Sequence, residues 1–446
     1  MKKYSIIILA AFSMATFSGC EKVLEVEPTT AIEFGEAITN YTTLERASLG
    51  AYSAFQDDDY YGLSYLLYQD LYADNLTFSG TYSTHREVAS RAINTSNLQI
   101  ANTWAAIYTA INRTNIVIRE ADLLTNITDE ERSNIKAQMY FLRGLAYFDL
   151  VKVFGGVPLI QTPTTEIPEI QYTARSTESQ TYDAIIADLT AAESGLDVAS
   201  ANTLASKSAA TALLARVYLQ RGNNAQAEAK AMEVLENSEY ALVDNFSTIF
   251  SNEGNSEVIF AIDFTLNDQN GLGSASDPTT TGQRFYLSAG AYNALSASTN
   301  DERFAATTVL VGSRRRLIKY NDVVNNSNNV PVIRLAEMYL IRAEARARQG
   351  VGTAVDMQVN SDISAITERA GLSPVTSLTN TEALTEILNQ RRLEFIGEGL
   401  RFMDLKRYDL TGTVLGFADE DAYKNLWPIP LQQIEVNNTL VQNPGY

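Results

Sequence analysis

The chain has 446 residues and a net charge of −19, from 53 acidic and 34 basic side chains. This excess of negative charge repels a phosphate backbone, which argues against nucleic-acid binding. The chain holds one cysteine, Cys20, and one histidine, His85, so a disulfide framework and a His-rich zinc site are excluded.

The first 19 residues are typical of a secretory signal peptide. Lys2 and Lys3 precede an apolar run from Tyr4 to Phe12 that is too short to span a bilayer. Cys20 directly follows Ser18-Gly19, as in a bacterial lipobox, where the cysteine is lipidated and becomes the first mature residue. Position 17 is Phe where Leu is usual, and an ordinary signal peptide with an unrelated cysteine is the alternative.

No second apolar stretch reaches spanning length. We therefore predict a signal peptide over residues 1–19, a lipidated tether over 20–40 and a body over 41–446. Contact with the membrane is expected through the lipid anchor alone, because the acidic body offers no basic patch for anionic lipid.

Helical periodicity dominates the first half of the body. Apolar stripes predict helices over residues 42–55, from Trp104 through Ile111, over 135–154 and over 178–196. Trp104 lies on an apolar face, which favours a core position over a ligand platform. Asp57-Asp58-Asp59 lacks the alternation of an EF-hand, so a solvated turn is favoured over a calcium loop, and no metal site is predicted.

Two helix pairs carry the small residues of a tetratricopeptide repeat. In residues 206–236, Ala215, Tyr218, Gly222 and Ala227 fall at the expected places. A second pair begins at Ile333 and is broken at Gly350, and the helices near 140 and 180 form a possible degenerate pair. Helical repeats are therefore predicted over about 41–240 and 331–410, since small residues let neighbouring helices approach closely.

Two polar segments interrupt this scaffold. A loop-rich insertion is predicted over about 241–330, with strand candidates at Glu257–Phe264 and Arg316–Tyr320. Periodicity also fails from Phe78 to Gln99, which predicts a loop. Loops on a rigid scaffold are where binding groups tend to lie.

The C-terminal part combines a charged helical region with an extended end. Opposite charges recur three residues apart in Arg391–Glu394, Glu398–Arg401, Arg401–Asp404 and Asp404–Arg407. This spacing is more typical of an ion-pair lattice on or between helices than of catalytic carboxylates. Residues 411–446 are predicted to be extended, with Trp427 packing the terminus onto the body.

The chain resembles the SusD/RagB family of outer-membrane lipoproteins from Bacteroidetes over essentially its whole length. The resemblance rests on motifs throughout the chain: Cys20 to Pro28, Trp104 to Tyr108 with Asn112 and Asn115, Arg143 to Pro158, Asp301 to Phe304, Ile333 to Ala345, Arg391 to Tyr408, and Leu426 to Pro430. It implies a mainly α fold, in which a tetratricopeptide-like helical scaffold carries an irregular, loop-rich part with a few short strands.

The resemblance also implies a function and a partner. Members of the family are lipid-anchored at the outer face of the outer membrane, where they cap a SusC-type TonB-dependent barrel and capture glycans, or sometimes peptides, for import. This implies a non-catalytic binding protein without a cofactor. A carboxylate-based glycoside hydrolase and a repeat adaptor for another protein are the alternatives.

Aromatic loop residues are the candidates for ligand contact, because the apolar face of a sugar stacks on a ring while its hydroxyls bond to polar neighbours. Singly, each candidate is as consistent with packing on the scaffold, and His85 by itself is typical of a surface histidine. The candidate residues are Tyr82, His85, Arg86, Gln283, Arg284, Phe285 and Tyr286.

Overall fold

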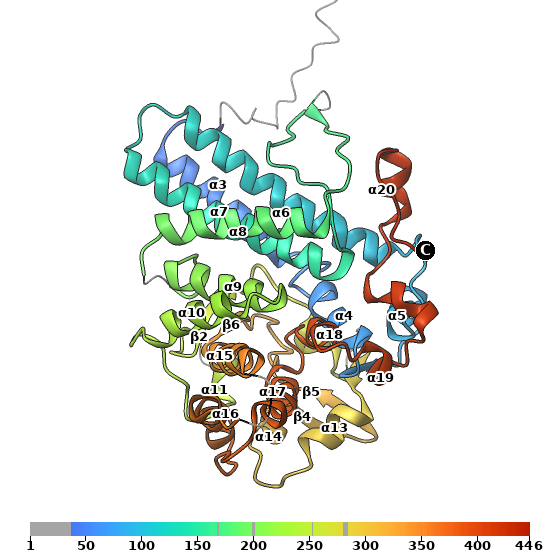
Figure 1. The fold of residues 1–446 in the computed structure, drawn as a ribbon. Helices are drawn as coiled ribbons and strands as arrows, with labels where there is room; N and C mark the ends of the chain where they lie inside the picture. Colours follow the sequence, from blue (N-terminus) through green and yellow to red (C-terminus); the bar gives the residue numbers. More distant parts are fainter. Residues whose placement is uncertain are drawn as a thin grey trace, which may run out of the picture.

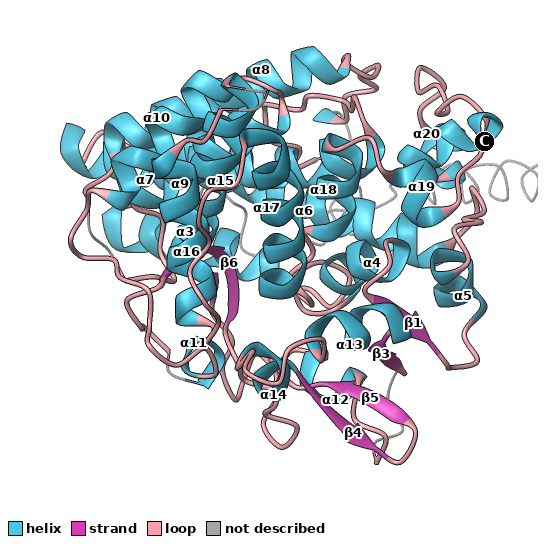
Figure 2. Ribbon diagram, turned by 60° about the horizontal axis from the view of Figure 1, so that its bottom comes forward, coloured by secondary structure: helices cyan, strands magenta, loops and turns pink. Residues whose placement is uncertain are grey.

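The computed structural model describes residues 37–166, 169–198, 201–251, 253–279, 284–350, 352 and 354–446. The predicted signal peptide, Cys20 and most of the predicted tether lie outside these ranges, as does Gln283. Helices form most of the described chain, and the strands between them are short (Figures 1 and 2). The mainly α fold predicted from the sequence is confirmed.

The predicted helices of the first half are present. The ends of the first and last differ little from the prediction, whereas the helix predicted from Trp104 through Ile111 is much longer, and the helix predicted over 135–154 starts six residues earlier. The observed helices are α3 (Tyr41–Ser53), which continues into η2 (Ala54–Gln56), α6 (Leu98–Leu123), α7 (Asp129–Phe154) and α8 (Glu178–Gly195). Asn40, Thr128 and Thr177 start α3, α7 and α8 with capping boxes, which satisfy otherwise unpaired backbone N–H groups. Every residue from Phe141 to Phe154 is buried, so α7 forms the centre of this layer.

The two predicted repeat pairs lie side by side, although about a hundred residues separate them in the chain. The first pair is α9 (Lys207–Gln220) with α10 (Asn224–Leu235), and the second is α15 (Leu335–Gln349) with α16 (Met357–Arg369). Helix α10 packs on α15 (Figure 1). Ala227, Ala231, Ala343 and Ala347 are fully buried, as close helix packing requires.

A two-stranded ladder joins the two ends of the insertion. Strand β2 (Val258–Ile262) pairs antiparallel with β6 (Val330–Arg334), and Val258 lies opposite Arg334. Both strands are buried along their whole length. Strand β6 ends at Arg334 and α15 begins at Leu335, so the ladder leads the chain back into the helical scaffold at the start of α15. Strand β2 was predicted, whereas β6 lies in a segment read as a loop and the start of a helix.

Four further strands form two small antiparallel pairs. Strand β1 (Leu76–Phe78) pairs with β3 (Phe285–Leu287), and β4 (Thr308–Val311) pairs with β5 (Arg314–Leu317). The predicted strand at Arg316–Tyr320 is therefore displaced toward the N-terminus. Short helices precede or follow these strands in the chain: α4 (Ser64–Tyr72), α5 (Ser83–Ala89), α11 (Thr248–Ser251), α12 (Leu272–Ala275), α13 (Ala289–Leu295) and α14 (Arg303–Thr307).

The C-terminal part is more helical than the sequence predicts. Helices α17 (Asn380–Phe395) and α18 (Arg401–Arg407) are followed by α19 (Thr411–Leu415), η4 (Asp419–Asn425) and α20 (Leu431–Val436). The expectation of an extended segment over 411–446 is thus wrong in part. Helix α20 starts directly after Pro430, whose fixed φ is compatible with a helix start, while α19 and η4 are short turns that the sequence pattern did not indicate. Trp427 is fully buried between Phe154 and Tyr72, as predicted.

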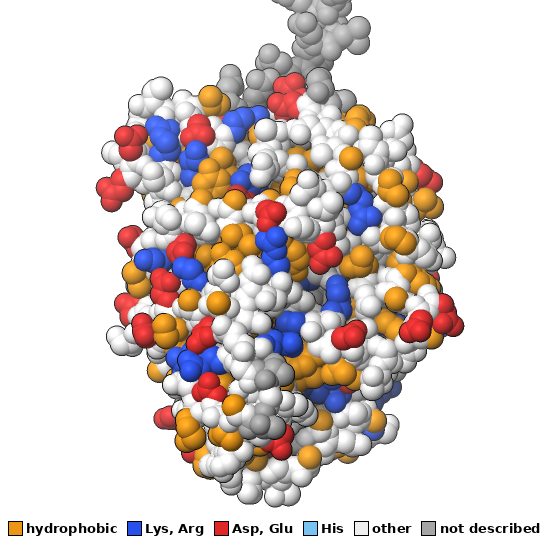
Figure 3. Space-filling model, in the orientation of Figure 1, with side chains coloured by type: hydrophobic (Ala, Val, Ile, Leu, Met, Phe, Trp, Pro, Cys, Tyr) orange, Lys and Arg blue, Asp and Glu red, His pale blue; other side chains and the backbone are white. Residues whose placement is uncertain are grey.

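The surface mixes charges of both signs. On the face drawn in Figure 3, basic and acidic side chains alternate among polar and apolar ones, and no single patch collects the acidic excess. Within the described ranges, no helix combines the length and apolar character needed to cross a bilayer.

Candidate functional site

The β1–β3 pair brings together the two segments that carry the predicted ligand contacts. Phe78 pairs with Phe285 across the ladder, and the backbone N–H of Ser79 donates to the carbonyl of Arg284 over 3.0 Å. Tyr82, His85 and Arg86 follow directly on α5, a helix within the segment predicted to be a loop. Segments about two hundred residues apart therefore form one cluster.

His85 is the centre of this aromatic cluster, which we define as Phe78, Tyr82, His85 and Phe285. Its ring centroid lies 5.0 Å from that of Phe78, 5.4 Å from Tyr82 and 5.3 Å from Phe285, all in edge contacts. The side chain is 2% exposed and is hydrogen-bonded through Nδ1 to the hydroxyl of Tyr68. The expectation of a surface histidine is wrong, because α5 turns this residue onto the scaffold.

Tyr82 is the member of the aromatic cluster that faces solvent. It is 60% exposed at the start of α5, whereas Phe285 is 1% exposed. The buried ring of His85, itself packed against Phe78 and Phe285, thus backs the exposed ring of Tyr82, which presents an apolar aromatic surface to solvent.

The other described candidates, Arg86, Arg284 and Tyr286, lie outside the aromatic cluster. The guanidinium of Arg86 donates to the carbonyl of Gly80 over 3.0 and 3.2 Å, which ties α5 to the loop before it. Arg284 is half-buried and contributes its backbone to the ladder. Tyr286 is 4% exposed and its ring lies 5.6 Å from the guanidinium of Arg314, so it packs against β5 rather than facing solvent.

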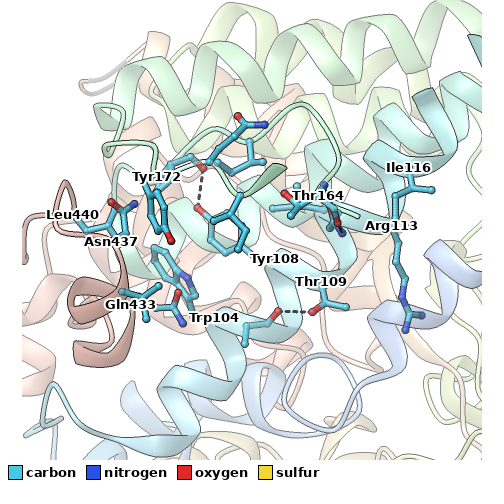
Figure 4. Close-up of a pocket in the computed structure, with 18 residues that line it drawn as sticks. Trp104, Tyr108, Thr109, Arg113, Ile116, Thr164, Tyr172, Gln433, Asn437 and Leu440 are labelled. Atoms are coloured by element: carbon cyan, nitrogen blue, oxygen red, sulfur yellow. Dashed lines mark hydrogen bonds between the residues drawn. The ribbon is translucent and has the colours of Figure 1, made fainter. Parts of the chain in front are cut away.

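A groove of about 540 Å³, which we call the α6 groove, opens elsewhere on the molecule (Figure 4). Three parts of the chain form it: one face of α6, the segment from Pro158 to Tyr172, and α20 with the residues that follow it. Trp104, Tyr108 and Asn112 lie one helical turn apart on α6 and line the same side.

The wall of the α6 groove opposite α6 is apolar and amide-rich. Tyr172 is 56% exposed, Ile170 is 44% exposed, and Gln433 and Asn437 project from the C-terminal segment. Among the described residues that line the groove, Arg113 is the one that carries a charge. The surface is therefore neutral over most of its area.

The sequence did not identify the α6 groove. Trp104 is 3% exposed and packs on Tyr108 and Phe154, so its predicted core position is confirmed. The same ring also lines the groove. No element was predicted around Tyr172, and Gln433 lies in the C-terminal segment predicted to be extended. The spacing of Trp104, Tyr108 and Asn112 was the available signal, but their partners across the groove follow from tertiary structure alone.

The carboxylates of the 391–407 region are engaged in ion pairs, mostly across elements. Of the four pairs predicted from spacing, Asp404–Arg407 is present at 2.8 Å. The other charges pair elsewhere: Arg391 with Asp404, Glu398 with Lys319 and Arg334, Glu394 with Arg303, Arg334 and Arg369, and Arg401 with Asp74. The lattice is largely buried between elements, so it is structural.

The arginines around Glu394 hold this carboxylate in the charged form. Burial would raise the pKa of Glu394, but Arg369, Arg334 and Arg303 outweigh it and keep that pKa well below its usual range. A general acid needs a raised pKa, so Glu394 is unsuited to that role. Within the described part of the chain, no group of three or more His, Cys, Asp or Glu side chains is placed to hold a metal ion.

Comparison with known proteins identifies the family. Residues 22–219 match a family model described as "Starch-binding associating with outer membrane", and residues 289–446 match the SusD family model. SusD-like protein P2 of Formosa agariphila is 27% identical over the full length of both chains. Starch-binding protein SusD of Bacteroides thetaiotaomicron is 34% identical over 128 residues, which are 26% of this chain and 22% of that protein.

Solved structures agree with this result. A laminarin-binding SusD-like protein superposes with a TM-score of 0.79 at 26% identity, over 92% of this chain and all of the other. A SusD superfamily protein from Bacteroides thetaiotaomicron superposes with a TM-score of 0.80 at 24% identity, over 91% of this chain and all of the other, which supports the fold. The family-model matches cover α6, nearly all of α9, the second repeat pair and the C-terminal helices, and the chain belongs to the SusD/RagB family.

Proposed function

We propose that the protein is a non-catalytic, lipid-anchored binding protein of the cell surface. It captures a neutral oligosaccharide or polysaccharide and passes it to a SusC-type TonB-dependent barrel in the outer membrane. The name of the laminarin-binding relative supports the ligand class, and the family model described as outer-membrane associated supports the location.

One observation carries the binding part of the proposal: a ladder joins two distant segments, and the buried ring of His85, packed on Phe285, supports the exposed ring of Tyr82. An open ring on a rigid base loses little conformational entropy when a sugar stacks on it. Arg86, Gln283 and Arg284 are the proposed polar contacts to hydroxyls. His85 supports the ring of Tyr82, and Phe285 packs against His85, whereas Tyr286 packs against Arg314 of β5.

The test of binding is calorimetry of the chain from residue 21 with hexasaccharides of glucose, mannose and xylose. For the hexasaccharide that binds, Tyr82→Ala should weaken affinity about fivefold or more, because an aromatic contact contributes about 1 kcal/mol. Leu123→Ala is the matched control, since Leu123 is 65% exposed at the far end of α6. Equal affinities of the Tyr82→Ala variant and wild type would contradict the assignment.

Delivery and anchoring need a separate experiment in the native membrane. Extraction in mild detergent should recover the protein together with an outer-membrane barrel, and palmitate labelling should disappear in Cys20→Ser. Recovery of the protein alone would contradict the transporter partnership. Labelling that persists in Cys20→Ser would contradict the anchor.

A further inference from the structure

The α6 groove has a rigid floor that does not depend on a ligand. The hydroxyl of Tyr108 donates to the carbonyl of Pro158 over 2.8 Å. The amide of Asn112 donates to the carbonyl of Thr164 and accepts from its N–H, over 2.9 and 2.8 Å. The ring of Trp104 is held 4.9 Å from that of Phe154. Helix α6 is thereby fixed relative to Pro158 and Thr164 of the neighbouring segment.

The opposite wall is fixed as well, although the wall and the floor come from distant parts of the chain. Asn437 donates to the carbonyl of Thr173 over 3.0 Å, and the hydroxyl of Thr439 donates to the carbonyl of Tyr172 over 3.3 Å. These bonds tie the end of α20 to the segment that presents Tyr172. Tyr172 therefore stands over the groove on an anchored backbone (Figure 4).

The chemistry of the lining selects a neutral ligand with flat apolar faces and hydroxyls. Three aromatic residues line the groove, and no carboxylate is among its described lining residues in a chain of net charge −19. The guanidinium of Arg113 is engaged with the carbonyl of Gly50 at 2.8 Å. Amides such as Gln433 offer both a donor and an acceptor at the rim. A volume of 540 Å³ lies in the usual range for small-molecule sites.

We propose that the α6 groove is a second carbohydrate site, distinct from the aromatic cluster around Tyr82. A neutral oligosaccharide stacks on Tyr172 and contacts the half-buried ring of Tyr108, Trp104 lies in the floor beneath it, and Gln433 bonds to its hydroxyls. The inference shares its ligand class with the proposed function, but none of the described residues lining the groove belongs to the aromatic cluster. Two sites on one chain raise the avidity for a polysaccharide that reaches both.

Tryptophan fluorescence can report the binding of a ligand in the α6 groove. The chain contains two tryptophans, Trp104 and Trp427. Trp104 lines the groove, while Trp427 is fully buried. Titration of the chain from residue 21 with laminarihexaose, maltohexaose, cellohexaose, mannohexaose and xylohexaose should therefore change tryptophan emission for at least one sugar.

Variants separate the two sites. Tyr172→Ala should raise the emission midpoint about fivefold to tenfold, as expected for loss of an aromatic contact, and Gln433→Ala should raise it about threefold. Tyr82→Ala should leave the emission midpoint within twofold of wild type. The melting temperature of each variant, compared with wild type, checks that the exposed substitutions leave the fold intact.

Several outcomes would overturn the inference. These are unchanged emission with all five sugars, a midpoint unaffected by both groove variants, or a change produced by a casein digest and by none of the sugars. If no sugar changes tryptophan emission while Tyr82→Ala weakens the affinity measured by calorimetry, the proposed site in the α6 groove is contradicted and the proposed function is supported. If Tyr172→Ala and Gln433→Ala raise the emission midpoint and Tyr82→Ala changes neither the midpoint nor the calorimetric affinity, binding at the aromatic cluster is contradicted and the site in the α6 groove is supported.

Discussion

At the scale of single residues, Asp149 is the most heavily bonded side chain in the helical core. The hydroxyls of Tyr60, Tyr61 and Tyr65 donate to its carboxylate over 2.7, 2.9 and 2.8 Å, and the ammonium of Lys152 lies 2.8 Å away. Burial, with the charge of Asp149, raises the pKa of all three tyrosines well above its usual range. One carboxylate thus satisfies four buried polar groups.

Replacement of this carboxylate should therefore be costly. Asp149→Ala leaves the ammonium of Lys152 and three hydroxyls buried without their acceptor, and we expect the free energy of unfolding to fall by about 3–5 kcal/mol. Urea denaturation at pH 7 measures the loss. Asp183→Ala is the control, because its ion pair with Arg221 at 2.6 Å is exposed and should contribute about 1 kcal/mol or less. Equal losses in the two variants would contradict this account.

At the scale of elements, the two glycines after α7 decide how the chain leaves the helix. Gly155 has φ +74°, a conformation that favours glycine, and it ends α7. At Gly156, a Cβ would lie 2.0 Å from the carbonyl oxygen of Ser176. This close approach lets Arg175 donate to the carbonyls of Gly156 and Phe154 over 2.7 and 3.0 Å. The segment that walls the α6 groove begins at this point.

Comparison of Gly156→Ala with Gly222→Ala should therefore separate the steric cost of a new methyl group from the cost of an unfavourable backbone conformation. At Gly156, the new methyl group must push two backbone segments apart, and we expect the free energy of unfolding to fall by about 3 kcal/mol. Gly222→Ala is the counterpart, since Gly222 has φ +80° and a Cβ added there would meet nothing within 4 Å, and it should cost about 1 kcal/mol. Urea denaturation of both variants gives the comparison, and a smaller loss at Gly156 would refute the steric argument.

At the scale of the whole molecule, buried ion pairs connect parts that the sequence separates. Arg334 of β6 binds Glu257, the residue before β2, at 2.6 Å, Glu394 of α17 at 2.9 Å and Glu398 at 2.8 Å. Glu344 of α15 binds Arg407 of α18 at 2.7 Å. The insertion, the second repeat pair and the C-terminal helices are thus joined through charges that are desolvated and mutually satisfied.

This network predicts loss of stability in acid. Burial would raise the pKa of Glu344, but Arg407 and Arg348 outweigh it and lower the pKa to about 2, against about 4.3 for an unfolded glutamate. Its contribution is therefore present above about pH 4.3 and is lost as the pH falls toward 2. Asp70 has the opposite effect on stability. Burial raises its pKa to about 6, so the folded protein holds this proton more tightly than the unfolded chain does. Protonation of Asp70 therefore stabilises the fold as the pH falls from about 6 toward 4.

The measurement is the urea midpoint of wild type and Glu344→Gln from pH 7 to pH 2.5. Wild type should lose stability steeply below about pH 4.5. Glu344→Gln should be less stable at pH 7 and should fall less steeply in acid, because its side chain does not titrate. Parallel curves for the two proteins would show that Glu344 does not carry the pH dependence.

The sequence by itself determined the helices, the repeat pairs and the family motifs, because these depend on local periodicity, capping residues and helix stops. It also selected Tyr82, His85 and Phe285, although nothing local showed that they meet. Tertiary structure decided that the β1–β3 ladder joins their segments, that His85 is buried, and that Tyr172 and Gln433 face Trp104 across a groove. The physical reason is that strand pairing and groove walls arise from contacts between residues hundreds of positions apart, which leave no periodic signal in either partner.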